Sequence, residues 1–120
     1  MNGIKYLLDT NIIIGVLKGN EQTVRLTQDI NLSACAFSAI TRMELLGFPG
    51  ITEQEELTIK ALLLRMTHLT LNAAIEDATI QLKQQRRLKL PDAVIVATAT
   101  VYQLELITLD KQLMTDRDAV

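Results

Sequence analysis

Short apolar segments that alternate with longer helical patterns constrain the fold of this 120-residue chain most strongly. Apolar runs of strand length occupy residues 4–8, 32–37, 69–71 and 106–108. The segments between them carry helix signals, at 11–17, 21–30, 38–46, 53–66, 72–88 and 92–104. Strands buried on both faces of a sheet have continuous apolar sequences. The alternation therefore predicts an α/β fold with a parallel sheet covered by helices on both sides.

Residues typical of helix ends support these boundaries. Ser38 is a favourable N-cap for the third helix. Thr52 and Glu55 have the spacing of a capping box, in which each side chain accepts a backbone N–H at the start of the helix. Pro91 is well placed in the first turn of the last helix, and Gly19 follows the first one. We therefore expect one domain over residues 1–120, with no internal linker.

Composition limits the classes of function. A net charge of −2 and a pI near 5.3 exclude a protein held on nucleic acid by bulk positive charge, so any such role needs a local site. The N-terminal segment matches neither a signal peptide nor a membrane span. The single cysteine, Cys35, allows no internal disulfide, fits a reducing cytoplasm and has the apolar neighbours of a buried, inert thiol.

Acidic residues stand where the predicted strands end and the helices begin. Asp9 follows the first strand directly, and Asp110 ends the last strand segment. Glu44 lies about two turns into the helix after the second strand, and Asp92 lies in the first turn of a nearly all-apolar helix. In sheets of this kind, ligands bind beyond the carboxyl ends of the strands. The acids are therefore expected to meet at one edge of the sheet.

A cluster of carboxylates in apolar surroundings needs a partner. Asp9 follows Leu7-Leu8, and Asp92 is followed by Ala93-Val94-Ile95, with no basic residue directly beside either acid. Clustered carboxylates repel one another, and a divalent cation such as Mg²⁺ or Mn²⁺ removes that penalty. Taken singly, each acid has an ordinary alternative: helix capping for Asp9 and Asp92, solvent exposure for Glu44 and a turn for Asp110.

At these acids the chain resembles the PIN-domain nucleases, and among them the VapC-type toxins of toxin–antitoxin modules. The resemblance rests on four blocks that occur in the same order and spacing over nearly the whole chain. The blocks are Leu7-Leu8-Asp9-Thr10-Asn11, Ser38-Ala39-Ile40-Thr41-Arg42-Met43-Glu44-Leu45-Leu46-Gly47, Leu90-Pro91-Asp92-Ala93-Val94-Ile95-Val96-Ala97-Thr98-Ala99 and Leu106-Ile107-Thr108-Leu109-Asp110.

The resemblance implies a three-layer α/β/α sandwich with a central, mostly parallel sheet of four to five short strands. It implies a catalytic quartet of Asp9, Glu44, Asp92 and Asp110, in which Asp9, Asp92 and Asp110 hold one or two Mg²⁺ or Mn²⁺ ions. The implied polar supports of this quartet are Thr10, Asn11, Ser38 and Thr108. The implied activity is metal-assisted hydrolysis of RNA by an endoribonuclease. The implied partners are a cognate antitoxin, whose tail enters the active-site groove, and a second copy of the chain in a homodimer.

Several alternatives stay open at this point. Asp116 or Asp118 could replace Asp110 as the fourth acid. The basic residues Arg86, Arg87 and Lys89 either bring RNA phosphates toward Asp92 or only stabilise the end of a helix. The apolar stretches 45–48 and 62–64 either form a dimer or antitoxin surface or are buried within the domain.

Other functional classes compete with the nuclease. The alternative function is a non-catalytic PIN-like module that binds RNA or a protein. A receiver or phosphatase domain would also place an aspartate at a strand end, but Asp9-Thr10-Asn11 lacks the paired acids that such domains use. The only histidine, His68, excludes a paired-histidine ribonuclease mechanism within one chain.

Overall fold

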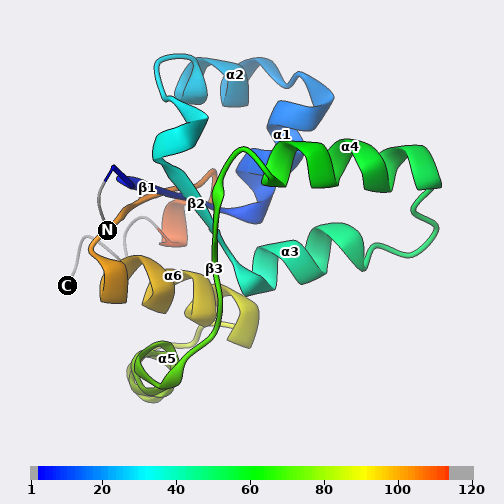
Figure 1. The fold of residues 1–120 in the computed structure, drawn as a ribbon. Coiled ribbons are helices and arrows are strands. Elements are labelled where there is room, and N and C mark those ends of the chain that lie inside the picture. The colour runs from blue at the N-terminus through cyan, green and yellow to red at the C-terminus, as the bar shows by residue number, and fades with distance from the viewer. Residues whose placement is uncertain (1–2, 114–120) are drawn as a thin grey trace.

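The computed structural model describes residues 3–113 and places four strands among helices (Figure 1). The strands are β1 (Tyr6–Leu8), β2 (Cys35–Ser38), β3 (Thr67–Leu69) and β4 (Glu105–Ile107). The helices are α1 (Thr10–Lys18), α2 (Glu21–Thr27), a 3₁₀ helix (Leu32–Ala34), α3 (Ala39–Leu46), α4 (Glu53–Leu63), α5 (Ala73–Gln85) and α6 (Leu90–Tyr102). The alternation of strands and helices predicted from the sequence is confirmed.

The four strands form one parallel sheet in the order β3-β2-β1-β4. Tyr6 pairs with Cys35 on one side and with Glu105 on the other, and Leu8 pairs with Ile107. This register brings the carboxyl ends of β1 and β4 together, although about a hundred residues separate them along the chain. The segments that follow these two strands therefore lie side by side at the same edge of the sheet.

Each face of the sheet has its own core, because successive side chains of a strand point to opposite faces. Leu7 and Leu106 face α6 and pack with residues such as Val96. Leu8 and Phe37 face the other way, toward α1, α3 and α4. Helix α5 packs on the outside of α6, as Figure 1 shows. The predicted three-layer α/β/α sandwich is therefore confirmed.

Two predicted strands differ in their bounds from the observed ones. Leu32–Ala34 forms a 3₁₀ turn because the Asn31 side chain accepts the Ser33 N–H at 3.0 Å and so begins a turn. The third strand is Thr67–Leu69, two residues earlier than expected. Its last residue is buried, whereas Leu71 is 44% exposed, so an apolar pattern alone could not locate the paired residues.

A close approach between α1 and α2 sets the packing of the first helical hairpin. A Cβ on Gly15 would overlap the fully buried Thr23 side chain, so only glycine allows this approach. Gly19 ends α1 with a φ of 67°, a conformation that glycine adopts without strain. Across residues 3–113 the structure contains no helix with the length and apolar character needed to span a bilayer.

Candidate active site

Asp9 lies at the centre of the candidate site, between the end of β1 and the first turn of α1. Its side chain is only 5% exposed. One carboxylate oxygen, Oδ1, accepts the N–H of Thr10 at 2.7 Å, and the other, Oδ2, accepts the hydroxyl of Thr108 at 2.7 Å. Two neutral donors thus fix both oxygens of a buried carboxylate.

The electrostatic balance at Asp9 favours the protonated acid. Burial raises the pKa of Asp9 above its usual value, and the two hydrogen bonds lower it by less. The charges of Asp92 and Glu44 raise the pKa of Asp9 further. Among the described residues, no lysine or arginine forms an ion pair with Asp9. This carboxylate therefore lacks a positive partner from its own domain, as the sequence predicted.

Glu44 reaches the site from helix α3 through a chain of hydroxyl groups. The Thr10 hydroxyl donates to Glu44 Oε1 at 2.7 Å and lies 2.9 Å from the hydroxyl oxygen of Thr41. Thr10 therefore contacts two acids, since its backbone N–H binds Asp9 and its side chain binds Glu44. Its hydroxyl joins the start of α1 to α3.

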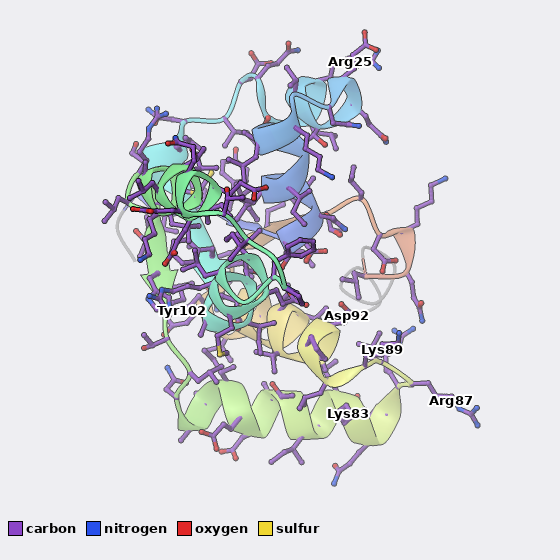
Figure 2. The ribbon with its side chains drawn as sticks, turned by 90° about the vertical axis from the view of Figure 1, so that its right-hand side faces the viewer. Arg25, Lys83, Arg87, Lys89, Asp92 and Tyr102 are labelled. Atoms are coloured by element: carbon purple, nitrogen blue, oxygen red, sulfur yellow. The ribbon has the colours of Figure 1, made fainter. Side chains whose placement is uncertain are left out.

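Asp92 lies in the first turn of α6, where the helix dipole favours a negative charge. Partial burial raises the pKa of Asp92, the charge of Asp110 raises it further, and Lys89 lowers it. Figure 2 shows Lys89 on the segment that leads into α6, on the same side of the molecule as Asp92. Asp92 therefore feels one acid and one base at close range.

Asp110 is connected to Asp9 through a shared threonine. The Asp110 N–H donates to Thr108 Oγ1 at 3.0 Å, while the same hydroxyl donates to Asp9. The Asp110 carboxylate accepts the Gln112 N–H at 2.9 Å and so caps the following turn. The rival fourth acids, Asp116 and Asp118, lie outside the described residues.

The four acids are connected by repulsion. Asp9 interacts with Glu44 and Asp92, and Asp92 interacts with Asp110. Within the described part of the chain, no three acidic, histidine or cysteine side chains already converge as a metal cluster. Mg²⁺ commonly keeps several waters and takes only one or two carboxylates directly. Hard oxygen donors around a buried carboxylate without a cation therefore fit Mg²⁺ or Mn²⁺ in their chemistry.

The other predicted polar supports act on the backbone rather than on the acids. The Asn11 Oδ1 accepts the N–H of Leu109 at 3.3 Å and ties α1 to the segment after β4. Ser38 is buried and caps α3 by accepting the N–H of Ile40 at 3.1 Å. Ser38 therefore positions the helix that carries Glu44. Within residues 3–113, no hydrogen bond joins Ser38 to an acid of the quartet.

The predicted basic residues lie on the segment between α5 and α6. Helix α5 ends at Gln85, earlier than expected, and Arg86 follows as its C-cap. Arg87 and Lys89 are exposed, and Figure 2 shows Arg87 extending away from the domain. Lys83 folds back from the last turn of α5 and donates to the carbonyl of Leu88 at 2.7 Å. This contact holds the basic segment against the helix.

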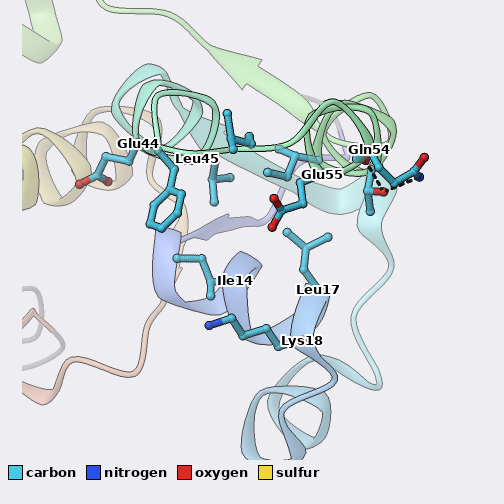
Figure 3. Close-up of a pocket in the computed structure, with 11 residues that line it drawn as sticks. Ile14, Leu17, Lys18, Glu44, Leu45, Gln54 and Glu55 are labelled. Atoms are coloured by element: carbon cyan, nitrogen blue, oxygen red, sulfur yellow. Dashed lines mark hydrogen bonds between the residues drawn. The ribbon is translucent and has the colours of Figure 1, made fainter.

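An apolar groove adjoins the acids through Glu44. It has a volume of about 420 Å³ and lies between α1 and the helices α3 and α4. Its lining includes Ile14, Lys18, Leu45 and Phe48, as well as Glu44 itself (Figure 3). Phe48 is 65% exposed and Ile14 is 38% exposed, so part of the predicted apolar stretch 45–48 is open to solvent.

Sequence reasoning missed two residues of this region, Thr41 and Lys83. Thr41 is fully buried, and its signal was a polar residue on the apolar side of α3, three positions before Glu44. Lys83 looked like one more cation near a helix end. The expected structural role of Cys35 is supported, since burial raises the pKa of its thiol to about 11. His68 stacks on Phe37, with ring centroids 5.2 Å apart.

Comparisons with known proteins agree with this geometry. The family model of the PIN domain matches residues 6–117. A chain of a toxin–antitoxin complex from Klebsiella pneumoniae is 31% identical, with 89% of this chain and 88% of the other covered and a TM-score of 0.80. A chain of VapBC-1 from nontypeable Haemophilus influenzae is 30% identical, with 94% of each chain covered and a TM-score of 0.73.

A more distant structure shares the fold. A chain of DNA-bound VapBC from Salmonella typhimurium is 22% identical, with 93% of this chain and 91% of the other covered and a TM-score of 0.80. No curated protein sequence matches the chain. The family model covers nearly the whole chain. The chain therefore belongs to the PIN domain family, whose members are generally nucleases.

Proposed function

We propose that this chain is a metal-dependent endoribonuclease and the toxin of a VapBC-type toxin–antitoxin pair. The observation that carries the proposal is the buried, doubly hydrogen-bonded carboxylate of Asp9, which repels two other acids and has no cationic partner among the described residues. A structural carboxylate in this position would be expected to have a lysine or arginine beside it. The arrangement is instead suited to a divalent cation that the solvent supplies.

The residues of the quartet would divide the chemistry. Asp9 and Asp92 would hold Mg²⁺ or Mn²⁺ directly, and Asp110 would complete the ligand set. When bound, such a cation lowers the pKa of a coordinated water and offsets the charge of the scissile phosphate. Glu44, which is held by Thr10, would orient the attacking water or hold a water of the cation. Thr108 would keep the plane of the Asp9 carboxylate fixed by its hydrogen bond.

Substrate binding would rely on the RNA backbone. Arg87 and Lys89 are exposed near Asp92, where they could bind phosphates on either side of the cut, with Arg86 at the base of the same segment. Aromatic residues make up only 3% of the chain, so base stacking contributes little. We therefore expect recognition of RNA shape and of backbone phosphates.

The proposed antitoxin would occupy the apolar groove beside Glu44. This proposal rests on the similarity to chains of toxin–antitoxin complexes and on the exposed apolar lining of the groove. A helix or extended tail with apolar anchors would bury Phe48 and Ile14 and would block access to the acids. A charge-introducing substitution such as Phe48→Asp should weaken the complex while RNA cleavage by the free toxin continues.

A homodimer of the toxin is also expected. Leu71, Ile80 and Leu90 are about half exposed and form an apolar patch where α5 meets α6. A second copy of the chain could cover such a patch. Sedimentation at micromolar concentration measures this directly, and a monomer at that concentration would contradict a constitutive dimer.

Two assays test the proposed activity together. Purified protein is mixed with structured RNA in Mg²⁺, in Mn²⁺ or in EDTA, and Mn²⁺ binding is measured by calorimetry. We expect cleavage only with the metals, loss of cleavage in Asp9→Asn, and growth arrest on induction of the wild type but not of this variant. Asp77→Asn removes an exposed acid on α5 and serves as the matched control.

Two results would overturn the proposal. Cleavage that persists in EDTA or in Asp9→Asn would exclude the metal mechanism at this site. A wild-type protein that neither binds Mn²⁺ nor cuts RNA would instead indicate a PIN-like binding module. The neighbouring open reading frame provides a separate check, because a VapBC-type module requires a short gene for a DNA-binding antitoxin there.

A further inference from the structure

Thr41 has no role in the proposed quartet, yet it is fully buried and polar. Within the described residues, its hydroxyl has a single hydrogen-bond partner, the hydroxyl of Thr10 at 2.9 Å. Other buried threonines of this chain, such as Thr79 and Thr98, instead bond a carbonyl of their own helix. The hydroxyl of Thr41 therefore points out of its helix and toward the site.

The direction of the protons follows from the acceptors. Glu44 is acceptor-only when ionised, so the one hydroxyl proton of Thr10 is donated to Glu44 Oε1. The Thr10 oxygen can then only accept from Thr41. A buried hydroxyl needs a partner, and Thr41 meets that need by donating to Thr10. The result is a chain of two hydrogen bonds that runs from Thr41 through Thr10 to Glu44.

We propose that Thr41 is a positioning residue that fixes the rotamer of Thr10 and through it holds Glu44 over the site. This inference rests on the proposed nuclease function. Threonine has a methyl and a hydroxyl group on the same carbon, so its rotamer decides which of the two faces a neighbour. A hydroxyl at position 41 favours the Thr10 rotamer that presents its own hydroxyl there and leaves its proton for Glu44.

Thr41→Val keeps the shape of the side chain and removes the hydroxyl. The new methyl group favours a rotamer of Thr10 that presents its methyl group, which moves the hydroxyl away from Glu44. Because Glu44 is exposed and Thr10 is its only donor among the described residues, its carboxylate would then sample several rotamers. We expect kcat for RNA to fall about tenfold, the loss typical of one hydrogen bond to a charged group, with little change in KM.

The experiment compares four proteins: wild type, Thr41→Val, Thr41→Ser and Thr98→Val. Thr41→Ser retains the hydroxyl and should keep most of the activity, whereas Thr98→Val removes an equally buried hydroxyl far along α6 and should lower only the stability. Thermal denaturation in EDTA confirms that each variant folds. In a Glu44→Gln background, Thr41→Val should cause no further loss of kcat, because both changes act on the same group.

A second measurement does not depend on activity. Crystal structures of the metal-free wild type and of Thr41→Val report the rotamers of Thr10 and Glu44. The proposal expects one Glu44 rotamer in the wild type and several in the variant. An unchanged Glu44 rotamer, equal losses of kcat in Thr41→Val and Thr41→Ser, or an undiminished loss in the Glu44→Gln background would each overturn it. If the wild type cuts no RNA, the proposed function fails, and the crystal structures alone decide the role of Thr41.

Discussion

The substitution Asp9→Asn should stabilise the metal-free protein while it abolishes function. Asparagine has nearly the shape of aspartate and can keep both hydrogen bonds of Asp9. Its Oδ1 can accept the Thr10 N–H, and its amide can donate to Thr108 Oγ1, which has two acceptor lone pairs. What the substitution removes is a buried negative charge that also repels Asp92 and Glu44.

The size of the gain follows from opposing contributions. Burying a charge costs several kcal/mol, and each hydrogen bond to a carboxylate offsets about 1.5–3 kcal/mol of that cost. The raised pKa of Asp9 shows that the hydrogen bonds offset the cost incompletely. Asparagine avoids the charge and keeps about 1 kcal/mol for each neutral hydrogen bond. We therefore expect a net gain on the order of 1 kcal/mol at neutral pH, which raises the melting temperature by about 4 °C.

The assay is thermal and urea denaturation at neutral pH, first in EDTA and then with Mn²⁺. In EDTA, Asp9→Asn should unfold at a higher temperature than the wild type, and the control Asp77→Asn should not. With Mn²⁺, the wild type should gain stability because the cation binds only the folded protein, whereas Asp9→Asn should not respond. A variant less stable than the wild type in EDTA would refute the view that Asp9 is a strained, unpaired charge.

Three further predictions concern pH, packing and substrate. Because burial raises the pKa of Asp9, the folded state holds this proton more tightly than the unfolded chain, so in EDTA the free energy of unfolding should fall as pH rises from about 4 to 7. Urea denaturation should show that slope to be weaker in Asp9→Asn. Gly15→Ala should lower the unfolding free energy by about 1–3 kcal/mol through its overlap with Thr23, and Thr23→Ala should restore part of the loss in thermal denaturation. The double variant of Arg87→Ala and Lys89→Ala should raise KM for RNA, flatten the salt dependence of binding by about 0.7 per lost phosphate contact and leave calorimetric Mn²⁺ affinity unchanged.

Local sequence signals predicted the helices well. The capping box of Thr52 and Glu55 forms as expected, with donor–acceptor distances of 3.0 and 3.1 Å, because both partners lie within one turn. Ser38 caps α3 for the same reason. Strands of three or four residues depend on distant pairing partners, so their bounds were less certain. Thr67–Leu69 was displaced by two residues for this reason.

The site divides along the same line between local and distant partners. Asp9 and Asp92 could be singled out from the sequence because each places a charge among apolar neighbours. The pairing of Thr10 with Thr41 joins residues 31 positions apart, and that of Asp9 with Thr108 joins residues 99 positions apart. The resemblance alone had implied Thr108 as a support. For Thr41 no partner could be named until the fold placed α1 beside α3.

The nature of the donors around the acids argues for a site built to receive a cation. Asp9 and Glu44 are held by a backbone N–H and by threonine hydroxyls, all of them neutral. A lysine in any of these places would orient a carboxylate equally well, but it would also neutralise the charge and compete with a metal. Neutral donors fix the geometry and leave the repulsion between the acids intact. That repulsion destabilises the metal-free fold and is relieved by cation binding, so stability and metal affinity should change in opposite directions when a quartet acid is made neutral.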